Sequence, residues 1–482
     1  MGEMTPVEEL TVVETHLSGR SRALQPACPE RGIYHVGTLR YTIGGLAVLF
    51  CWLLWGDLAA TMFLQIFGVF LPLYLKGLGS SNVLIAFLAT GVGGLMNLTL
   101  MPNISIWSDR HRGRWGRRIP FLLWSAPIAT IALIGVGLSS DIAQMIRHTI
   151  SPLQMVSRVH VTVVVVSVCI VVYSLFQMIT NNTYQFLLRD VVPQESMAWF
   201  ISLFRVVGTC GTLLFQWFMF GFIKSNPAAL CIGLGAANVL GFLLISWRVK
   251  EGRYPSPPAR NGNFILGQVK LYRSYLRNNF AIQIYRDYIV VWILVITGLV
   301  ATASFLVLFC TKTLDIGVKD YGRILFYGTL ATAVLYVPIG YLCNRLHSIR
   351  VMMLSLVGLA IGAAIGFFLV FDRTELLVYS IMMAAPTVAW QLGSLTLAME
   401  LYPADEFGQF SSALYVFGCG SLLLTSYVVG KYMDLCNGHY RMIFLVQLVC
   451  FCLALVPMVR VYRGWKRHGG PDHYMPPKPR KK

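Results

Sequence analysis

The sequence predicts an all-α membrane protein with twelve transmembrane helices, arranged as two pseudo-symmetric six-helix bundles. Of its 482 residues, 56% are hydrophobic and 12% are charged, which is about half the charged share of ordinary soluble domains. Apolar stretches of roughly 18 or more residues recur along the chain, and each is long enough to cross a bilayer as a helix. An internal repeat relates the two halves.

Six expected helices form each half of the chain. In the first half they span Thr42–Leu75, Asn82–Trp107, Pro120–Leu138, Val161–Leu188, Met197–Phe222 and Ala228–Trp247. In the second half they span Tyr288–Leu314, Tyr321–Cys343, Val351–Phe371, Leu377–Glu400, Gln409–Met433 and Arg441–Val461. An even number of crossings places both termini on the same side of the membrane.

These spans define the expected domain organisation, which comprises an N-terminal tail (1–41), a first bundle (42–247), a linker (248–287), a second bundle (288–461) and a basic C-terminal tail (462–482). The linker contains a basic, amphipathic portion around Lys270–Arg277, which is typical of a segment lying on the membrane surface. Residues Ser139–His160 have room for a short interfacial helix.

The formal net charge of +18 does not indicate a nucleic-acid partner, because the basic residues gather in short loops and at the C-terminal end. The densest block is Arg110, Arg112, Arg114, Arg117 and Arg118. Cytoplasmic loops carry such an excess of Lys and Arg. We therefore expect a multi-pass protein of the inner or plasma membrane with both termini in the cytoplasm.

The internal repeat is clearest between residues 187–208 and 397–418. A constant offset of 210 pairs an acid, a proline, a second acid, a phenylalanine, a serine and a glycine: Asp190 with Glu400, Pro193 with Pro403, Glu195 with Asp405, Phe200 with Phe410, Ser202 with Ser412 and Gly208 with Gly418. Ser108, Asp109 and Arg110 likewise correspond to Cys343, Asn344 and Arg345 at an offset of 235. Parallel repeats of this kind occur in transporters whose binding site lies near the bilayer midplane, between the halves.

The segment Pro102–Leu123, PNISIWSDRHRGRWGRRIPFLL, closely resembles the loop between helices 2 and 3 of the major facilitator superfamily. Its form SDRxRxRWGRRxPF is similar to that of the glycoside-pentoside-hexuronide cation symporters, such as melibiose permease, and of the sucrose-proton symporters. The pattern RDVVPQE at Arg189–Glu195 and Gly56–Asp57 in the first helix also look like that branch. The resemblance covers the helical core and implies the major facilitator fold.

The arginine-rich loop is the candidate gate. Asp109 can pair with an arginine and with the positive N-terminus of a helix in the same half, and breaking that contact would favour inward opening. The alternative is that the arginines merely set the topology. The candidate gating residues are Asp109, Arg110, Arg114, Gly116, Arg117, Arg118, Asp190 and Glu400.

The candidate substrate site consists of polar stripes on three helices. Polar side chains inside a bilayer cost free energy, so a stripe on one helix face indicates a water-filled cavity or substrate path. Amides and a carboxylate can bond sugar hydroxyls, while aromatic rings cover apolar ring surface; alternatively, such stripes join helices. The candidates are Asp57, Thr61 and Gln65 on helix 1, Gln177, Asn181 and Gln185 on helix 4, and Trp390, Gln391 and Ser394 on helix 10.

Asp57 is the candidate proton carrier. It is the acid placed well inside helix 1, and it matches the carboxylate that in melibiose permease-like proteins contacts the sugar. Burial favours the neutral, protonated form of a carboxyl group. A structural alternative is an ion pair between Asp57 and a buried arginine such as Arg205.

Departures from the branch at three positions bear on coupling. Sodium-coupled members carry further carboxylates on helices 2 and 4, where this chain has Asn97, Met101 and Asn181. We therefore favour proton coupling over sodium coupling. The cysteines show no metal-ligand or redox spacing, so we expect no cofactor.

The expected function is secondary active transport of a sugar or glycoside by alternating access, by a monomer. The alternatives are a facilitator-fold carrier of amphipathic or lipid-like solutes, and an uncoupled uniporter or exporter. An enzyme is not expected, because intramembrane clusters of nucleophile, acid and base are missing. A sensor is not expected either, because the tails are too short for a signalling domain.

Overall fold

The computed structural model describes residues 33–36, 38–252, 280, 282–403 and 407–477. Most of the expected N-terminal tail, the central part of the expected linker and the last five residues lie outside these ranges.

The first half opens with a two-stranded antiparallel hairpin, β1 (Ile33–Val36) and β2 (Leu39–Thr42), in which Ile33 pairs with Thr42. The hairpin was not expected from the sequence. The helices that follow are α2 (Ile43–Gly77), α3 (Asn82–Ala86), α4 (Val92–Thr99), α5 (Met101–Arg110), α6 (Ile119–Gly137), α7 (Ser139–Thr149), α8 (Arg158–Val191), α9 (Gln194–Leu214), α10 (Phe222–Ser225) and α11 (Pro227–Arg248). A π-helical turn, η1 (Phe87–Gly91), joins α3 to α4, and another, η3 (Phe215–Met219), extends α9.

The second half consists of α13 (Gln283–Ile296), α14 (Thr302–Leu308), α15 (Val318–Leu346), α16 (Ser348–Leu369), α17 (Arg373–Met382), α18 (Ala384–Leu401), α19 (Phe407–Leu435), α20 (Met442–Arg467) and α21 (Gly470–His473). The π-helical turns η4 (Thr297–Ala301) and η5 (Phe309–Thr313) make α13 and α14 one continuous span.

Within the described ranges, twelve helices are long and apolar enough to cross a membrane. This confirms the expected fold class. The second span differs from expectation, because η1 and the start of α5 at Met101 divide it into three pieces. The segment after the third span does contain a short helix, α7.

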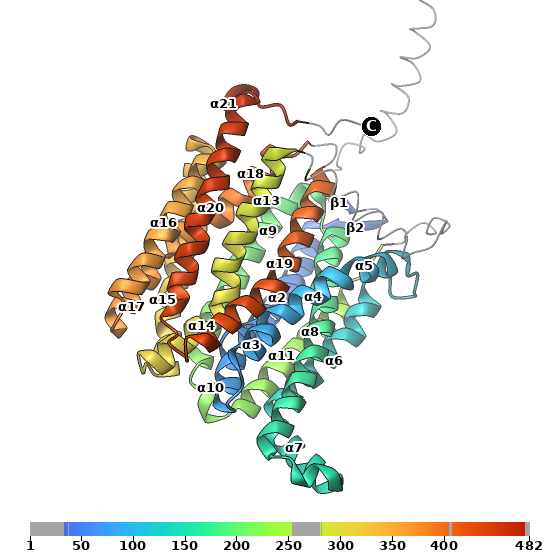
Figure 1. Ribbon diagram of the computed structural model, residues 1–482. Helices are drawn as coiled ribbons and strands as arrows, with labels where there is room; N and C mark the ends of the chain where they lie inside the picture. The colour runs from blue at the N-terminus through green and yellow to red at the C-terminus, as the bar shows by residue number, and fades with distance from the viewer. Residues whose placement is uncertain (1–32, 37, 253–279, 281, 404–406, 478–482) are drawn as a thin grey trace, which may run out of the picture.

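The bundle has two distinct ends in Figure 1. The hairpin and α21 lie at the upper end, whereas α7 projects from the lower end. We call these the terminal end and the far end. The first half (blue to green) and the second half (yellow to red) lie side by side, with α19 of the second half placed against α3 and α4 of the first.

Small residues let the halves approach closely. A Cβ added to Gly430 of α19 would lie 2.6 Å from Val83 Cα, and one added to Gly94 of α4 would lie 2.7 Å from the Cys419 carbonyl oxygen. The same holds between α15 and η3, where a Cβ at Gly322 would lie 2.6 Å from a backbone oxygen. Only glycine permits these helix crossings, which are typical of membrane proteins.

A polar cluster joins the halves at the far end. The Asp434 carboxylate, near the end of α19, accepts hydrogen bonds from Asn82 N at 2.9 Å and Val83 N at 3.2 Å, the first residues of α3. Asn82 Oδ1 accepts from Tyr440 Oη at 3.1 Å and from Lys76 Nζ at 3.2 Å. A carboxylate at a helix N-terminus satisfies free N–H groups and complements the helix dipole. This Asp434 cluster therefore holds the halves together at the far end.

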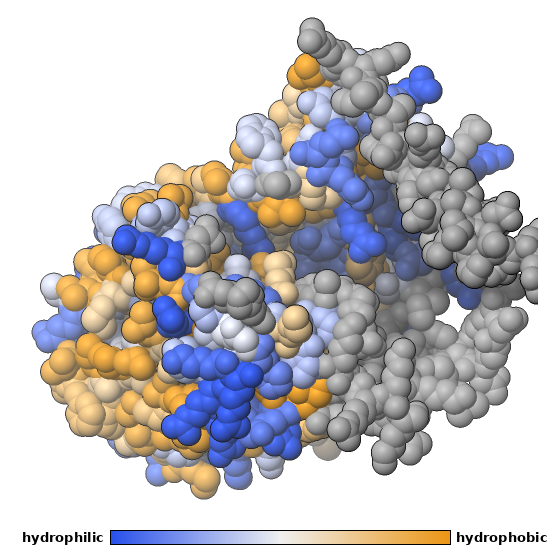
Figure 2. All heavy atoms as spheres, turned by 90° about the horizontal axis from the view of Figure 1, so that it is seen from above, coloured by the Kyte–Doolittle hydropathy of each residue, from blue (hydrophilic) through white to orange (hydrophobic). Residues whose placement is uncertain are grey.

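The terminal end is hollowed. Figure 2 views the molecule from this end and shows a recess with hydrophilic side chains on its walls. The Asp434 cluster and the aromatic contacts of Trp217 with Phe326 and of Phe220 with Tyr321 hold the halves together farther down. The structure is thus closed at the far end and open at the terminal end.

Candidate functional site

Asp57 lies on α2 where that helix crosses α9. It is 6% exposed, and its Oδ2 atom lacks a hydrogen-bond partner in the described residues. A Cβ added to Gly208 of α9 would lie 3.1 Å from that oxygen. Gly208 therefore leaves room for a buried carboxylate between two helices.

Arg205 lies one turn from Gly208 on α9 and interacts electrostatically with Asp57, without an ion pair between them in the described residues. Arg205 is exposed and also interacts electrostatically with Tyr336 of α15, in the other half. Tyr336 in turn donates a hydrogen bond to Gln391 Oε1 on α18. The hydrogen bond from Tyr336 to Gln391 lies within the second half, and Arg205 is the charge of the first half that acts on Tyr336.

The other expected residues of helix 1 contact α9. Gln65 Nε2 donates a hydrogen bond to Thr212 Oγ1 at 3.0 Å. Thr61 is half-buried, and its Oγ1 would lie 3.5 Å from a Cβ at Gly208. Gln65 therefore joins two helices of one half in this arrangement.

The polar stripe of helix 4 lies on α8, with two different environments. Gln177 is buried, and neither its Nε2 nor its Oε1 has a hydrogen-bond partner in the described residues. Asn181 and Gln185 are exposed. Leaving a buried amide without hydrogen bonds costs free energy. A water molecule or a solute that bonded the Gln177 amide would remove this cost.

The helix 10 residues lie on α18. Gln391 is exposed, whereas Ser394 is buried and its Oγ donates to the Gln391 carbonyl oxygen at 3.3 Å. Trp390 is also buried, with its ring centroid 5.8 Å from that of Trp292 on α13. In this state Trp390 supports a neighbouring ring rather than lining an open surface.

Trp292 is a candidate site residue that the polar stripes on helices 1, 4 and 10 did not include. Its Nε1 would lie 3.0 Å from a Cβ at Gly418, as Asp57 Oδ2 lies beside Gly208 in the first half. Gly208 and Gly418 are partners at the offset of 210, and Asp57 and Trp292 are separated by 235, the offset that relates Asp109 to Asn344. The repeat thus places a carboxylate in one half where the other half has an indole.

The candidate gate at the terminal end is a compact ionic cluster. Arg117 donates to Asp190 at 2.6 and 3.0 Å, and Arg118 donates to Asp190 at 3.1 Å and to Ser108 Oγ at 2.7 Å. Arg118 also pairs with Asp109. We call Ser108, Asp109, Arg117, Arg118 and Asp190 the arginine network.

The N-terminus of α6 is capped by a residue that the sequence did not single out. Glu251, after α11, accepts hydrogen bonds from the backbone N–H groups of Arg117 at 2.9 Å, Arg118 at 2.7 Å and Ile119 at 2.7 Å. Gly116 has φ +103°, and a Cβ there would lie 2.6 Å from Glu251 Cδ. The glycine of the WG pair is thus required by both backbone conformation and the carboxylate beside it.

The remaining gating candidates lie outside this network. Arg114 lines a surface groove, and Arg110 interacts with another group of the protein. Glu400, the repeat partner of Asp190, accepts a hydrogen bond from Ser348 Oγ at 3.0 Å. The arginine network joins elements of the first half and is intact while the terminal end is open.

No family model matches the chain. Short stretches are similar to curated sucrose transport proteins: 34% identity over 73 residues with SUC3 of Arabidopsis thaliana and 30% over 76 residues with SUT1 of Oryza sativa subsp. japonica. The matches cover 15% and 16% of this chain, and 12% and 14% of the relatives' lengths. They support the resemblance to the sucrose-proton symporter branch.

Solved transporters share the fold over most of the chain. A bacterial homologue of the human lysosomal transporter Spinster, inward-facing and unoccupied, has a TM-score of 0.64 at 13% identity and covers 89% of this chain and 99% of its own. A bacterial homologue of the iron transporter ferroportin, covering 86% and 99% at 16% identity, scores 0.62 in its inward-facing state and 0.55 in its outward-facing state.

The chain is therefore a multi-pass membrane protein with the fold of the major facilitator transporters. The proteins that it matches in sequence and in structure are transporters and not enzymes.

Proposed function

We propose that this protein moves a sugar or glycoside across the membrane by alternating access, driven by a proton that Asp57 binds and releases. The observation that carries the proposal is the buried Asp57 carboxylate, whose Oδ2 has no hydrogen-bond partner in the described residues. A carboxyl group held in this way can be protonated without first breaking a salt bridge.

The polar and aromatic candidates on the other spans support a polyhydroxylated solute. Gln177, Asn181, Gln185 and Gln391 supply amide donors and acceptors, and Trp292 supplies an aromatic face at the repeat-equivalent place in the second half. Sugars combine hydroxyl groups with apolar C–H surface, which these two kinds of side chain match. The short sucrose transporter matches point to the same solute class.

The terminal end is proposed to face the cytoplasm, because the arginine-rich loop lies there and cytoplasmic loops are enriched in Arg. With that orientation the structure is inward-open. The higher TM-score to the inward-facing ferroportin homologue supports this assignment. Outward opening would then require the Asp434 cluster to separate.

The test is uptake into proteoliposomes of the purified full chain, with a panel of mono-, di- and oligosaccharides. Each sugar is offered with no gradient, a proton gradient or a sodium gradient. We expect saturable accumulation of at least one sugar that collapses when the proton gradient is dissipated. Uptake of amphipathic solutes without any sugar uptake would replace the sugar proposal by the amphipathic alternative.

Asp57→Asn tests the proton role. Asparagine preserves the shape but cannot carry a proton, so we expect proton-driven accumulation to disappear while sugar exchange between equal concentrations continues. Asp287→Asn is the matched control, since Asp287 is also buried with an unpartnered Oδ2 in the described residues. Accumulation that survives Asp57→Asn with an unchanged pH dependence would disprove proton coupling through Asp57.

A further inference from the structure

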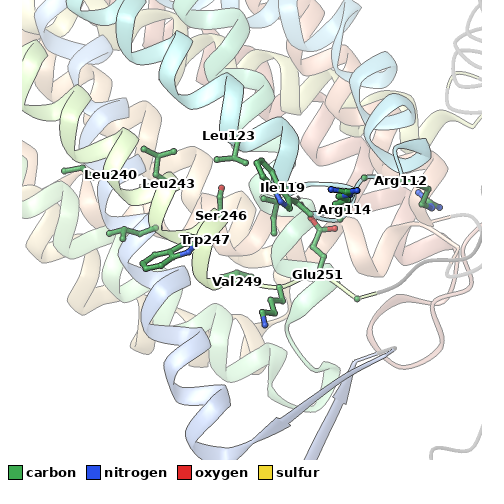
Figure 3. Close-up of a pocket in the computed structure, with 16 residues that line it drawn as sticks. Arg112, Arg114, Ile119, Leu123, Leu240, Leu243, Ser246, Trp247, Val249 and Glu251 are labelled. Atoms are coloured by element: carbon green, nitrogen blue, oxygen red, sulfur yellow. Dashed lines mark hydrogen bonds between the residues drawn. The ribbon is translucent and has the colours of Figure 1, made fainter.

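A groove lies outside the central site, between α6 and α11 at the terminal end. It has a volume of about 1060 Å³. Its walls come from α6, from α11 and from the segments that precede α6 and follow α11 (Figure 3). Both helices pack on elements of the first half, α6 on α8 and α11 on α2. The groove is therefore on the outer, lipid-facing side of that half.

One end of the groove is apolar. Leu240 and Leu243 of α11 are 57% and 40% exposed, and Leu123 of α6 lies opposite them. Exposed leucines on the outer face of a spanning helix are in contact with hydrocarbon. This end fits an acyl chain.

The other end is positively charged. Figure 3 places Arg112 and Arg114 at the opposite end of the groove from Leu240 and Leu243, and Lys250 also lines the groove. The nearby Glu251 carboxylate is already engaged by three backbone N–H groups at the start of α6. Glu251 keeps its negative charge, but the groove lining carries three basic side chains, Arg112, Arg114 and Lys250, against this one carboxylate. The net side-chain charge of the lining is therefore positive and suits a phosphate group.

Two tryptophans and a serine fix the depth of the groove. Trp115 and Trp247 line it and are 64% and 73% exposed, as expected for rings at the membrane–water interface. Ser246, between the two ends in Figure 3, has a buried Oγ without a hydrogen-bond partner in the described residues. A hydroxyl at that position can donate to an ester oxygen.

We propose that this groove binds an anionic glycerophospholipid, with its phosphate against Arg114 and Lys250, its ester region near Ser246 and an acyl chain along Leu240 and Leu243. The positive charge at one end of the groove, its apolar other end and its position at the membrane–water interface favour a lipid over a soluble anion. Basic grooves between spanning helices are known to hold anionic headgroups. This site is independent of the proposed sugar transport.

The experiment is native mass spectrometry of the full chain in detergent micelles, with phosphatidylglycerol or phosphatidylcholine added at equal concentrations. We expect retained phosphatidylglycerol adducts and few phosphatidylcholine adducts. In the double variant Arg114→Ala/Lys250→Ala, phosphatidylglycerol occupancy should fall by about tenfold. Arg460→Ala/Arg463→Ala, which removes two exposed charges from the terminal end of α20, should leave it unchanged.

A second variant tests the apolar end without altering charge. Leu243→Trp fills the groove and should also reduce phosphatidylglycerol adducts, whereas Leu453→Trp, at an exposed leucine of α20, should not. Equal adducts of the two lipids on the wild-type chain, or equal losses in variant and control, would overturn the proposal. Full competition by soluble glycerol phosphate would show an anion site rather than a lipid site.

Discussion

The two halves join their second and third spans in different ways at the terminal end. In the first half, residues 111–118 separate α5 from α6, and this loop is held by the arginine network and by Glu251. In the second half, His347 alone separates α15 from α16, at φ +67°. Within the described residues, Glu400 accepts a single hydrogen bond there, from Ser348.

This difference shows that two related halves can hold the connection between their second and third spans by different means. A loop of several residues has many conformations, and side-chain contacts must offset the entropy of fixing one of them. A one-residue connection has few conformations and needs no such network, but it imposes strain on that residue. The halves are thus related in fold while the source of their rigidity differs.

The largest expected effect comes from Arg118→Ala. Arg118 is 4% exposed, and its loss would leave Asp190 and Ser108 without that donor. Breaking a buried pair by removing one partner costs about 3 kcal/mol or more. We expect such a loss in the free energy of unfolding, measured by SDS-induced unfolding in detergent micelles.

Glu400→Gln is the matched change in the second half. Glutamine can still accept the hydrogen bond from Ser348, so we expect a loss of no more than about 1 kcal/mol. If the two variants were equally destabilised, the contrast between the halves would be wrong.

Gly116→Ala should have an intermediate effect. The methyl group meets the Glu251 side chain, and the backbone at φ +103° disfavours alanine. We expect a loss of about 1 kcal/mol from the backbone and about 1 kcal/mol more from the displaced cap, measured in the same unfolding titration. Gly79→Ala is the control, since Gly79 has φ +75° and open space around a Cβ. Losses of the same size in both variants would argue against the capping role of Glu251.

The smallest expected effect comes from His347→Gly. Glycine tolerates φ +67° with ψ 142°, so we expect stabilisation of up to about 1 kcal/mol, reduced by loss of the ring contact with Trp465. His347→Ala keeps the strain and loses the ring, and it should be less stable than His347→Gly in the same titration. The reverse order would show that the connection is unstrained.

The sequence by itself determined the features that depend on local properties. Length and hydropathy located twelve spans, because each must cross the same hydrocarbon thickness. The repeat and the arginine-rich loop indicated the major facilitator fold before any contact was known. Helical spacing also predicted the polar stripe that includes Asp57. The offset of 235 between the halves makes Trp292 the repeat partner of Asp57, which the sequence alone shows.

Tertiary structure decided which neighbour each helix face meets. Glu251 caps a helix more than a hundred residues earlier in the chain, Asp434 reaches Asn82 in the other half, and Gln65 bonds Thr212. Periodicity shows that a face is polar, but it does not show which helix lies opposite. The partner depends on the packing of whole helices, which small residues such as Gly208 and Gly430 permit at particular crossings.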